Sequence, residues 1–285
     1  MKQQEFIELA TMLRGFCVNV LLPIFRHVLQ EGQEIVAEKP REGMGRELVG
    51  WLDREITPRY KQFVRECFPD YEIVSEEGEN SWPPQTSKFW IFDECDGTHN
   101  ILAGLPTFGT MGALIEGGQV VFSFVFLPAN EIIQGNGFYA AARGCGAWQF
   151  SDPRERNVSD TPARIRVSGI ENLADAFVLF EGPTKKILGS PLANALKSAS
   201  RRHRYGVSSV WSGTLLASAS AYPSGFDALI FCDNSPWDTL PISLLVEEAG
   251  GRVTDHGGNR VTLQNCRNVV MSNGSIHDSI LALNR

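Results

Sequence analysis

The chain has 285 residues, enough to bury a large core in one layered domain or in two halves that share an interface. With 43% hydrophobic and 21% charged residues, it has the composition of an ordinary soluble globular protein. A formal net charge of −7 argues against a nucleic-acid-binding protein, which needs a clustered basic face to neutralise phosphates.

Cysteine spacing and the N-terminus predict the compartment. The six cysteines form neither a Cys-x-x-Cys pair nor a zinc spacing, and we interpret them as free thiols of a reducing compartment. The N-terminus enters an amphipathic pattern without a signal-peptide apolar region. The longest apolar run, Val120 to Ala129, is about half of the roughly 20 residues that a spanning helix needs. We therefore expect a cytoplasmic protein that binds neither membrane nor nucleic acid.

Two helices are predicted near the N-terminus. Apolar residues recur at helical spacing over 6–28 and again from about Glu47 to Cys67, each with one buried face. Pro23 should kink or divide the first helix. Asp53 lies just off the apolar stripe of the second, where the pattern alone predicts a solvated residue. Residues 71–74 then predict a short strand that leads into the acidic loop containing Glu76.

The most informative stretch begins at Trp90. An aromatic, apolar run typical of a buried strand ends in Asp93 and Asp96, followed by Gly97-Thr98. Carboxylates delivered by a strand into a tight glycine turn suit a hard cation such as magnesium. An Asp-Gly turn with solvated acids explains the same residues. Because Glu76 also follows a strand, it and Asp93 could reach the same edge of one sheet.

The middle of the chain is rich in predicted strands. Segments 108–115 and 120–126 flank Glu116-Gly117-Gly118-Gln119, a good hairpin signal. Segments 131–134 and 137–142 predict a second antiparallel pair, closed by the turn at 143–147. Helices followed by antiparallel strands indicate an α+β first half. The polar stretch 151–162, with two prolines, marks the boundary, and we divide the chain into 1–155 and 156–285.

Beyond the boundary, strands and helices alternate, which predicts an α/β second half. The strands expected are 176–180, 227–232, 251–255 and 268–272, and the helices are 191–200, 213–221, 239–249 and a short one from 276. Asp238 stands at a helix N-cap position, and Gly250-Gly251 where a C-cap belongs. Capping alone explains this aspartate, although a carboxylate at a helix start could also lie beside a bound phosphate.

Two stretches carry a resemblance to a known family. Asp93 to Asn100 resembles the signature Asp-Pro-(Ile/Leu)-Asp-Gly-Thr-x-Asn, and Trp237-Asp238 begins a second signature that ends in Glu248-Ala249-Gly250-Gly251. With Glu76 ahead of them, these stretches resemble the inositol monophosphatase superfamily of magnesium-dependent, lithium-sensitive phosphatases. The resemblance implies a layered αβαβα sandwich of the inositol monophosphatase / fructose-1,6-bisphosphatase type, with the two halves meeting at the metal site, and a homodimer.

The resemblance also implies residue roles. The ligands of two or three magnesium ions would be Glu76, Asp93, Asp96, Asp238 and the backbone carbonyl of Cys95. The catalytic residues would be Thr98, paired with Asp53, and Glu76. The substrate contacts would be Asp96, Gly97, Thr98, Ser212, Gly213, Thr214 and Asp238. The implied reaction is hydrolysis of a small phosphate monoester by a metal-activated water, without a phosphoenzyme.

The sequence departs from the family pattern at three positions. Glu94 stands where the family has proline, and we expect its side chain to turn outward; an inward turn would change metal number or affinity. Ser209 replaces an arginine. Phe231 stands where inositol-specific members carry a glutamate, so the substrate stays open among inositol, sugar, histidinol and nucleotide phosphates.

Two other functions remain as alternatives. The chain could be a non-catalytic family member that acts as a binding or regulatory protein, although it retains all four acids together with Thr98 and Asp53. A nucleic-acid-associated factor would depend on the basic cluster Arg201 to Arg204 alone. We expect that cluster to be a solvated loop, which could also meet an anionic substrate or a partner.

Overall fold

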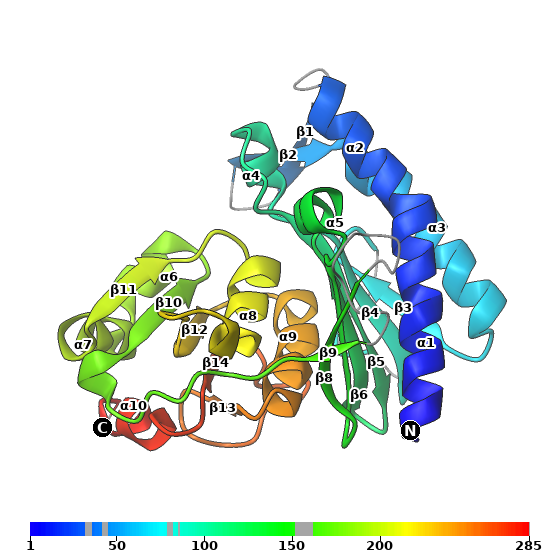
Figure 1. Cartoon of the computed structure of the whole chain (residues 1–285). Coiled ribbons are helices and arrows are strands. Elements are labelled where there is room, and N and C mark those ends of the chain that lie inside the picture. Colours follow the sequence, from blue (N-terminus) through cyan, green and yellow to red (C-terminus); the bar gives the residue numbers. More distant parts are fainter. Residues whose placement is uncertain (32–35, 42–44, 79–81, 85, 152–161, 285) are drawn as a thin grey trace.

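The fold is a five-layer αβαβα sandwich (Figure 1). The computed structural model describes residues 1–31, 36–41, 45–78, 82–84, 86–151 and 162–284, with the backbone alone for the described part of 28–54 and for 102. The outer helices of the first half are α1 (Gln3–Phe16), α2 (Leu22–Glu31) and α3 (Trp51–Cys67). The middle layer holds α8 (Ser209–Ala217) and α9 (Pro236–Glu248). The outer helices of the second half are α6 (Thr184–Gly189), α7 (Pro191–Ala199) and α10 (His277–Ala282).

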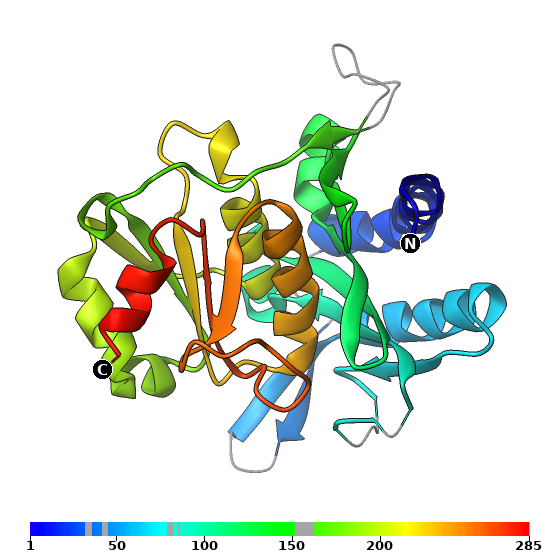
Figure 2. The ribbon, with the colours of Figure 1, turned by 90° about the horizontal axis from the view of Figure 1, so that it is seen from below.

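Two sheets lie between these helical layers, as the view from below also shows (Figure 2). The larger sheet has the order β3 (Glu72–Ser75), β4 (Lys88–Asp96), β5 (Gly109–Glu116), β6 (Gln119–Phe126), β7 (Phe138–Ala142), β8 (Gly146–Phe150) and β9 (Ala163–Arg164). The smaller has the order β11 (Arg202–Tyr205), β10 (Phe177–Glu181), β12 (Ala228–Cys232), β14 (Asn268–Ser272) and β13 (Arg252–Asp255). The predicted layered fold is confirmed, while the boundary at 155/156 lies outside the described residues.

The N-terminal helix forms as predicted and is interrupted next to its proline. A π-helical turn, Cys17–Leu21, separates α1 from α2 and comes just before Pro23. Proline lacks the N–H that would bond four residues back and crowds that carbonyl, so the turn widens there. By length and composition alone, Gln3–His27 could cross a membrane. In this fold its apolar face, including Phe6 and Leu13, packs in one cluster with aromatic residues of the larger sheet.

The second predicted helix starts later than the sequence indicated. Residues 47–50 belong to β2 (Gly45–Gly50), which pairs antiparallel with β1 (Val36–Arg41), and the helix α3 begins at Trp51. The prediction of helix from Glu47 was therefore wrong by one turn. Val49 continues the helical spacing, but its backbone hydrogen bonds go to the opposite strand of a hairpin that the apolar pattern did not indicate.

In the larger sheet, one predicted hairpin is confirmed and one strand is wrong. The β5–β6 turn consists of Gly117 and Gly118, whose φ angles of +57° and +74° suit a tight hairpin. Residues 131–134, predicted as a strand, lie in the helix α5 (Pro128–Gln134). Pro128 suits the first helical turn and Gly135, at φ +65°, ends the helix, so local capping prevailed over a short apolar run. Strand β7 pairs instead with β6 and β8.

The smaller sheet is mixed, with β10, β11 and β12 parallel and β13 and β14 antiparallel. All four predicted strands are present. Helix α8 begins at Ser209, one turn before the predicted residue 213. The basic cluster also differs from the prediction, because Arg202–Tyr205 forms the edge strand β11 rather than a loop, with all four side chains exposed.

Helix α9 is buried on all sides because it lies between the two sheets. Its residues 239–246 are buried, and Leu244 and Val246 belong to the core cluster that includes residues of both sheets. Ser235 is the N-cap and bonds with Asp238 in a capping box, so Asp238 is the third helical residue and not the N-cap that we predicted. Its carboxylate accepts the Ser235 amide at 3.2 Å.

A buried histidine predicts acid sensitivity. His277 is fully buried and bonds to Thr254 Oγ1 at 2.9 Å and Ser272 Oγ at 2.8 Å. Burial, aided by the charge of Arg252, lowers the pKa of His277 to about 4. In the unfolded chain this histidine becomes protonated below about pH 6.5, whereas in the native state it stays neutral down to about pH 4. The contribution of His277 to the free energy of unfolding should therefore fall by about 3 kcal/mol as the pH is lowered across this range. Urea denaturation at pH 7 and 4.5 should show a smaller loss in His277→Gln than in the wild type; equal losses would contradict this assignment.

Candidate metal centre

The acids of the β4 turn face one another because the strand is irregular at its end. The β4–β5 register shifts between Asp93 and Asp96, which pair with Met111 and Gly109. In a regular strand, residues three apart point to opposite faces, and a bulge of this kind can turn both to the same side. Asp238, from the first turn of α9, completes the group. One ligand oxygen from each of Asp93, Asp96 and Asp238 lies within 4.8 Å of the other two.

The electrostatics of this cluster are those of a cation site. Burial, followed by the charges of neighbouring carboxylates, raises the pKa of Asp93 and of Asp238 well above the usual value. Burial also raises the pKa of Asp96 to about 7. The charge of Glu76, just beyond the end of β3, contributes to all three shifts, so this residue acts on the same cluster. Crowded carboxylate oxygens fit magnesium, a hard cation that would relieve their repulsion.

The glycine turn after β4 is sterically required. Gly97 has φ +89°, and a Cβ there would lie 2.9 Å from the Thr107 carbonyl oxygen. Thr98 starts the short helix α4 (Thr98–Leu102), and its hydroxyl donates to the Cys95 carbonyl at 3.0 Å. The Cys95 thiol is buried in the apolar cluster beneath the sheet, consistent with a role for its carbonyl alone. The predicted pairing of Thr98 with Asp53 stays a prediction, because the Asp53 side chain lies outside the described residues.

The first turn of α8 holds Asp96, through residues to which the sequence assigned no role at the site, although Ser209 stood out as a departure from the family pattern. The Val210 amide donates to Asp96 Oδ2 at 2.5 Å, and the Ser208 hydroxyl and Ser209 amide lie beside this carboxylate and act to lower its pKa against the larger effect of burial. The available signal was Ser208, the N-cap of α8, whose hydroxyl accepts the Trp211 amide.

The predicted substrate contacts Ser212, Gly213 and Thr214 lie further along α8. Ser212 donates to Glu181, Thr214 donates to the Val210 carbonyl at 2.7 Å, and Gly213 packs against Ile242 of α9. Their contact with a substrate stays a prediction, and the residues of this segment that reach the acids are Ser208 to Val210.

The outward orientation expected for Glu94 was wrong. Its side chain is 1% exposed, and Oε1 accepts the Thr57 hydroxyl of α3 at 3.1 Å. Ser75 lies beside this carboxyl, yet within the described part of the chain neither Glu94 Oε2 nor the Ser75 hydroxyl has a hydrogen-bond partner. Burial raises the pKa of Glu94 to about 7. The residue that replaces the family proline is thus buried toward α3 and not turned to solvent.

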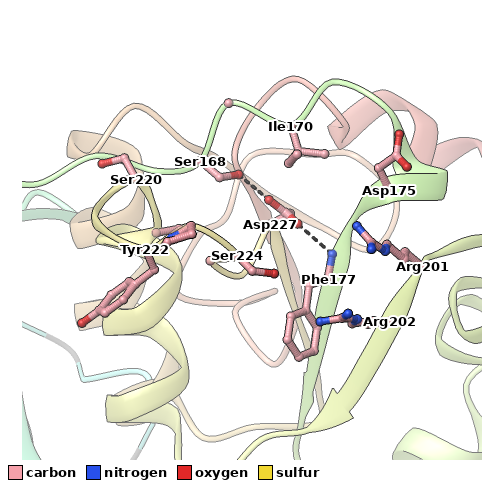
Figure 3. A pocket seen from close by; sticks show the side chains of 14 residues that line it. Ser168, Ile170, Asp175, Phe177, Arg201, Arg202, Ser220, Tyr222, Ser224 and Asp227 are labelled. Atoms are coloured by element: carbon pink, nitrogen blue, oxygen red, sulfur yellow. Dashed lines mark hydrogen bonds between the residues drawn. The ribbon is translucent and has the colours of Figure 1, made fainter.

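A separate cavity of about 340 Å³ lies at the amino end of β10, beside Phe177 (Figure 3). Arg201 and Arg202 line it together with Asp175 and Asp227. Asp227 is bonded to the Ser168 hydroxyl and, at 2.7 Å, to the Phe177 amide at the start of β10. Two arginines are therefore balanced by two aspartates, and they lie at the amino end of a strand whose carboxyl end faces the acid cluster. Arg201 and Arg202 therefore lie at this cavity and not among the acids of the candidate metal centre.

Comparison with known proteins identifies the family. A profile of the inositol monophosphatase family matches residues 8–285. The chain is 30% identical over 237 residues to the fructose-1,6-bisphosphatase/inositol-1-monophosphatase of Thermotoga maritima, covering 83% of this chain and 82% of that protein. It is 28% identical over 234 residues to the histidinol-phosphatase of Mycobacterium tuberculosis, covering 80% and 81%. The chain belongs to the inositol monophosphatase family, and the predicted class of phosphoric monoester hydrolase is confirmed.

Solved structures agree with the fold. The Thermotoga maritima IMPase superposes with a TM-score of 0.72 at 26% identity, covering 90% of this chain and 91% of that one. An IMPase/NADP phosphatase complexed with Mg²⁺ and phosphate superposes with a TM-score of 0.77 at 18% identity, covering 98% and 95%. The second similarity concerns the fold alone.

Removing one acid should stabilise the metal-free protein. Asp238→Asn keeps an oxygen for the Ser235 amide but removes one of the crowded charges, so without divalent cations its free energy of unfolding should exceed that of the wild type by about 1 kcal/mol or more. Added magnesium should raise the melting temperature of the wild type and have little effect on the variant. Thermal denaturation with EDTA and with MgCl₂ measures both effects, and equal magnesium shifts in the two proteins would count against a ligand role.

Glu94 should make the metal-free protein less stable at alkaline pH. The unfolded chain loses this proton near pH 4.5 and the native state only near pH 7, so the residue's contribution to the free energy of unfolding should fall by up to about 3 kcal/mol between these values. Glu94→Gln keeps an oxygen for Thr57 without the charge. Its stability relative to the wild type should therefore be greater at pH 8 than at pH 5, measured by urea denaturation in EDTA. A difference that does not change with pH would refute this.

Proposed function

We propose that this phosphatase is magnesium-dependent and hydrolyses a small phosphate monoester by direct attack of a metal-activated water. The observation that carries the proposal is the grouping of Asp93, Asp96 and Asp238 within 4.8 Å. These carboxylates, with Glu76 and the Cys95 carbonyl, would hold two or three magnesium ions. Four acids alone would repel a phosphate dianion, so this arrangement suits the substrate only when cations are bound.

The chemistry required of such a site is demanding, because uncatalysed phosphate monoester hydrolysis is among the slowest reactions known. Bound magnesium supplies charge neutralisation, a water of lowered pKa and stabilisation of the leaving oxygen. The Thr98 hydroxyl and the Asp53 carboxylate would orient the attacking water and take its proton. The amides of Gly97 and Thr98, at the start of α4, would bind phosphate oxygens. No side chain of this set needs to form a covalent intermediate.

The identity of the leaving group stays open within one chemical class. Phe231 is fully buried in the core, so position 231 offers no carboxylate to the hydroxyls of an inositol ring. Relatives are named as phosphatases of fructose-1,6-bisphosphate, inositol-1-phosphate and histidinol phosphate. We take these esters, with nucleotide phosphates, as the candidate substrates.

The assembly is proposed from the family resemblance, and the compartment from the cysteines. The family resemblance favours a homodimer. The six free cysteines, five of them buried, agree with a reducing cytoplasm. Light scattering on the purified protein measures the oligomeric state directly.

Loss of one ligand should abolish the activity while keeping the fold. Asp96→Asn retains an oxygen for the Val210 amide but removes the charge, so kcat/KM should fall by at least about 100-fold, since loss of an outer-shell partner alone costs about 10–100-fold. Phosphate release from a panel of inositol, sugar, histidinol and nucleotide monoesters, with magnesium and with or without lithium, measures this.

Two results would contradict the proposal. Undiminished activity in Asp96→Asn would remove that ligand from the mechanism. A wild type that binds magnesium but releases no phosphate from any ester would favour a non-catalytic binding protein.

A further inference from the structure

A second buried acid holds the α8 turn that binds Asp96. Glu181 is the last residue of β10 and is 9% exposed. Its Oε1 accepts the Ser212 hydroxyl, and the Ser208 amide lies beside its carboxyl group. Ser208 is the N-cap of α8, and Ser212 lies one turn further along the helix. Glu181 thus fixes α8 through Ser212, one turn beyond the N-cap.

The surroundings of Glu181 are shaped to fit its carboxyl group. A Cβ at Gly206, directly after β11, would overlap both Glu181 Oε1 and Ser212 Oγ. The backbone at position 206 therefore packs directly against the carboxyl group. Burying a carboxyl group is unfavourable unless donors compensate it, so this acid contributes little as packing alone. Here the hydroxyl donor is Ser212 of α8, and the amide of Ser208, the N-cap of that helix, lies beside the carboxyl group.

The residue beside Glu181 on the neighbouring strand β12 is apolar, so Glu181 carries the acidic group of this pair. Glu181 pairs in parallel register with Phe231 of β12, so the two side chains point to the same face of the sheet. Phe231 lies in the apolar core together with Leu240 and Leu244 of α9. Of the two paired residues, Glu181 of β10 therefore supplies the carboxyl group that faces α8, and Phe231 of β12 supplies none.

The contacts of α8 connect Glu181 to Asp96. The Ser208 amide lies beside Glu181, and the Ser208 hydroxyl lies beside Asp96. Two residues on, the Val210 amide donates to Asp96, and the Ser209 amide between them lies beside the same carboxylate. Because these donors lie on one helical turn, displacing Ser208 displaces all of them. The orientation of Asp96 then depends on a residue that does not itself belong to the acid cluster.

We propose that Glu181 is a positioning residue of the metal centre, which fixes the first turn of α8 so that its donors orient Asp96 toward the cation. The proposal deepens the function proposed above and depends on Asp96 as a magnesium ligand. Outer-shell partners of metal ligands act in this way, by holding the ligand in the conformation that the metal needs.

Magnesium affinity tests the proposal without reference to turnover. Glu181→Met keeps most of the side-chain volume but cannot accept the Ser212 hydroxyl and offers the Ser208 amide no oxygen, so the Kd for MgCl₂ alone should rise by about 10–100-fold. Ser212→Ala removes only the Ser212 hydrogen bond and should give a smaller rise. The Kd follows from the melting temperature measured as a function of MgCl₂ concentration. Most of the lost phosphatase activity should return at saturating magnesium, because the ligands themselves are intact.

A matched control separates positioning from general loss of stability. Glu131 is also a buried carboxylate that holds a backbone amide, that of Gly137 at 2.7 Å, and it pairs with Arg14 of α1 and is not a member of the acid cluster. Glu131→Met should lower the melting temperature and leave the magnesium Kd unchanged. Should Glu181→Met not fold, Ser212→Ala against Glu131→Met makes the same comparison.

The outcomes distinguish this inference from the proposed function. Folded Glu181→Met and Ser212→Ala proteins with the wild-type Kd for magnesium would overturn the positioning role, whatever the wild type hydrolyses. A wild type that binds no magnesium would overturn it together with the metal site. A wild type without phosphatase activity, whose magnesium Kd still depends on Glu181, would sink the proposed function and support the positioning role.

Discussion

The structure depends on one unfavourable arrangement, the close approach of several carboxylates at the carboxyl edge of a sheet. Asp93 and Asp238 come from different halves of the chain, and burial with mutual repulsion raises the pKa of each. Three features keep them together: the irregular end of β4, the glycine turn at Gly97, and a helix fixed between two sheets. The free energy that maintains this crowding comes from packing elsewhere, as is usual for functional sites.

The layered architecture explains how the two halves contribute to one site. The first half provides a strand end with its turn, and the second provides the N-termini of α8 and α9, both in the middle layer. Helix N-termini offer amides and a positive dipole end, so they suit acids and phosphates alike. In α8 the amides are directed to Asp96, whereas in α9 the capping box fixes Asp238. The middle layer therefore brings helix ends to the acids without needing basic side chains.

Much of this could be predicted from the sequence where a local signal was strong. The aromatic strand before Asp93, the Gly117-Gly118 hairpin and the alternation of the second half all appear in the structure. Predictions of secondary structure failed where a short segment fitted both a helix and a strand. The apolar pair at 132 and 133 fits a strand as well as a helix, and only the flanking Pro128 and Gly135 decide between them.

Site residues that depend on tertiary contacts were beyond prediction. Glu94 is polar and sits in an acidic turn, which indicates exposure, yet α3 covers it and Thr57 bonds to it. The role of Ser208 to Val210 depends on where α8 meets Asp96, over a separation of more than a hundred residues. Glu181 carries no motif at all. The roles of such residues depend on which helix packs against them in the folded chain, α3 for Glu94 and α8 for Asp96 and Glu181.

The burial of α9 has a consequence for how this protein can vary. A helix enclosed by two sheets has no free face, so a change of side-chain volume anywhere along it must be absorbed by moving the helix or a sheet. The first turn of that helix carries Asp238, whose carboxylate is one corner of the acid cluster. Core residues such as Leu244 and Val246 therefore constrain the chemistry as well as the fold. A substitution that another helix would absorb by local repacking would here move the Asp238 carboxylate relative to Asp93 and Asp96.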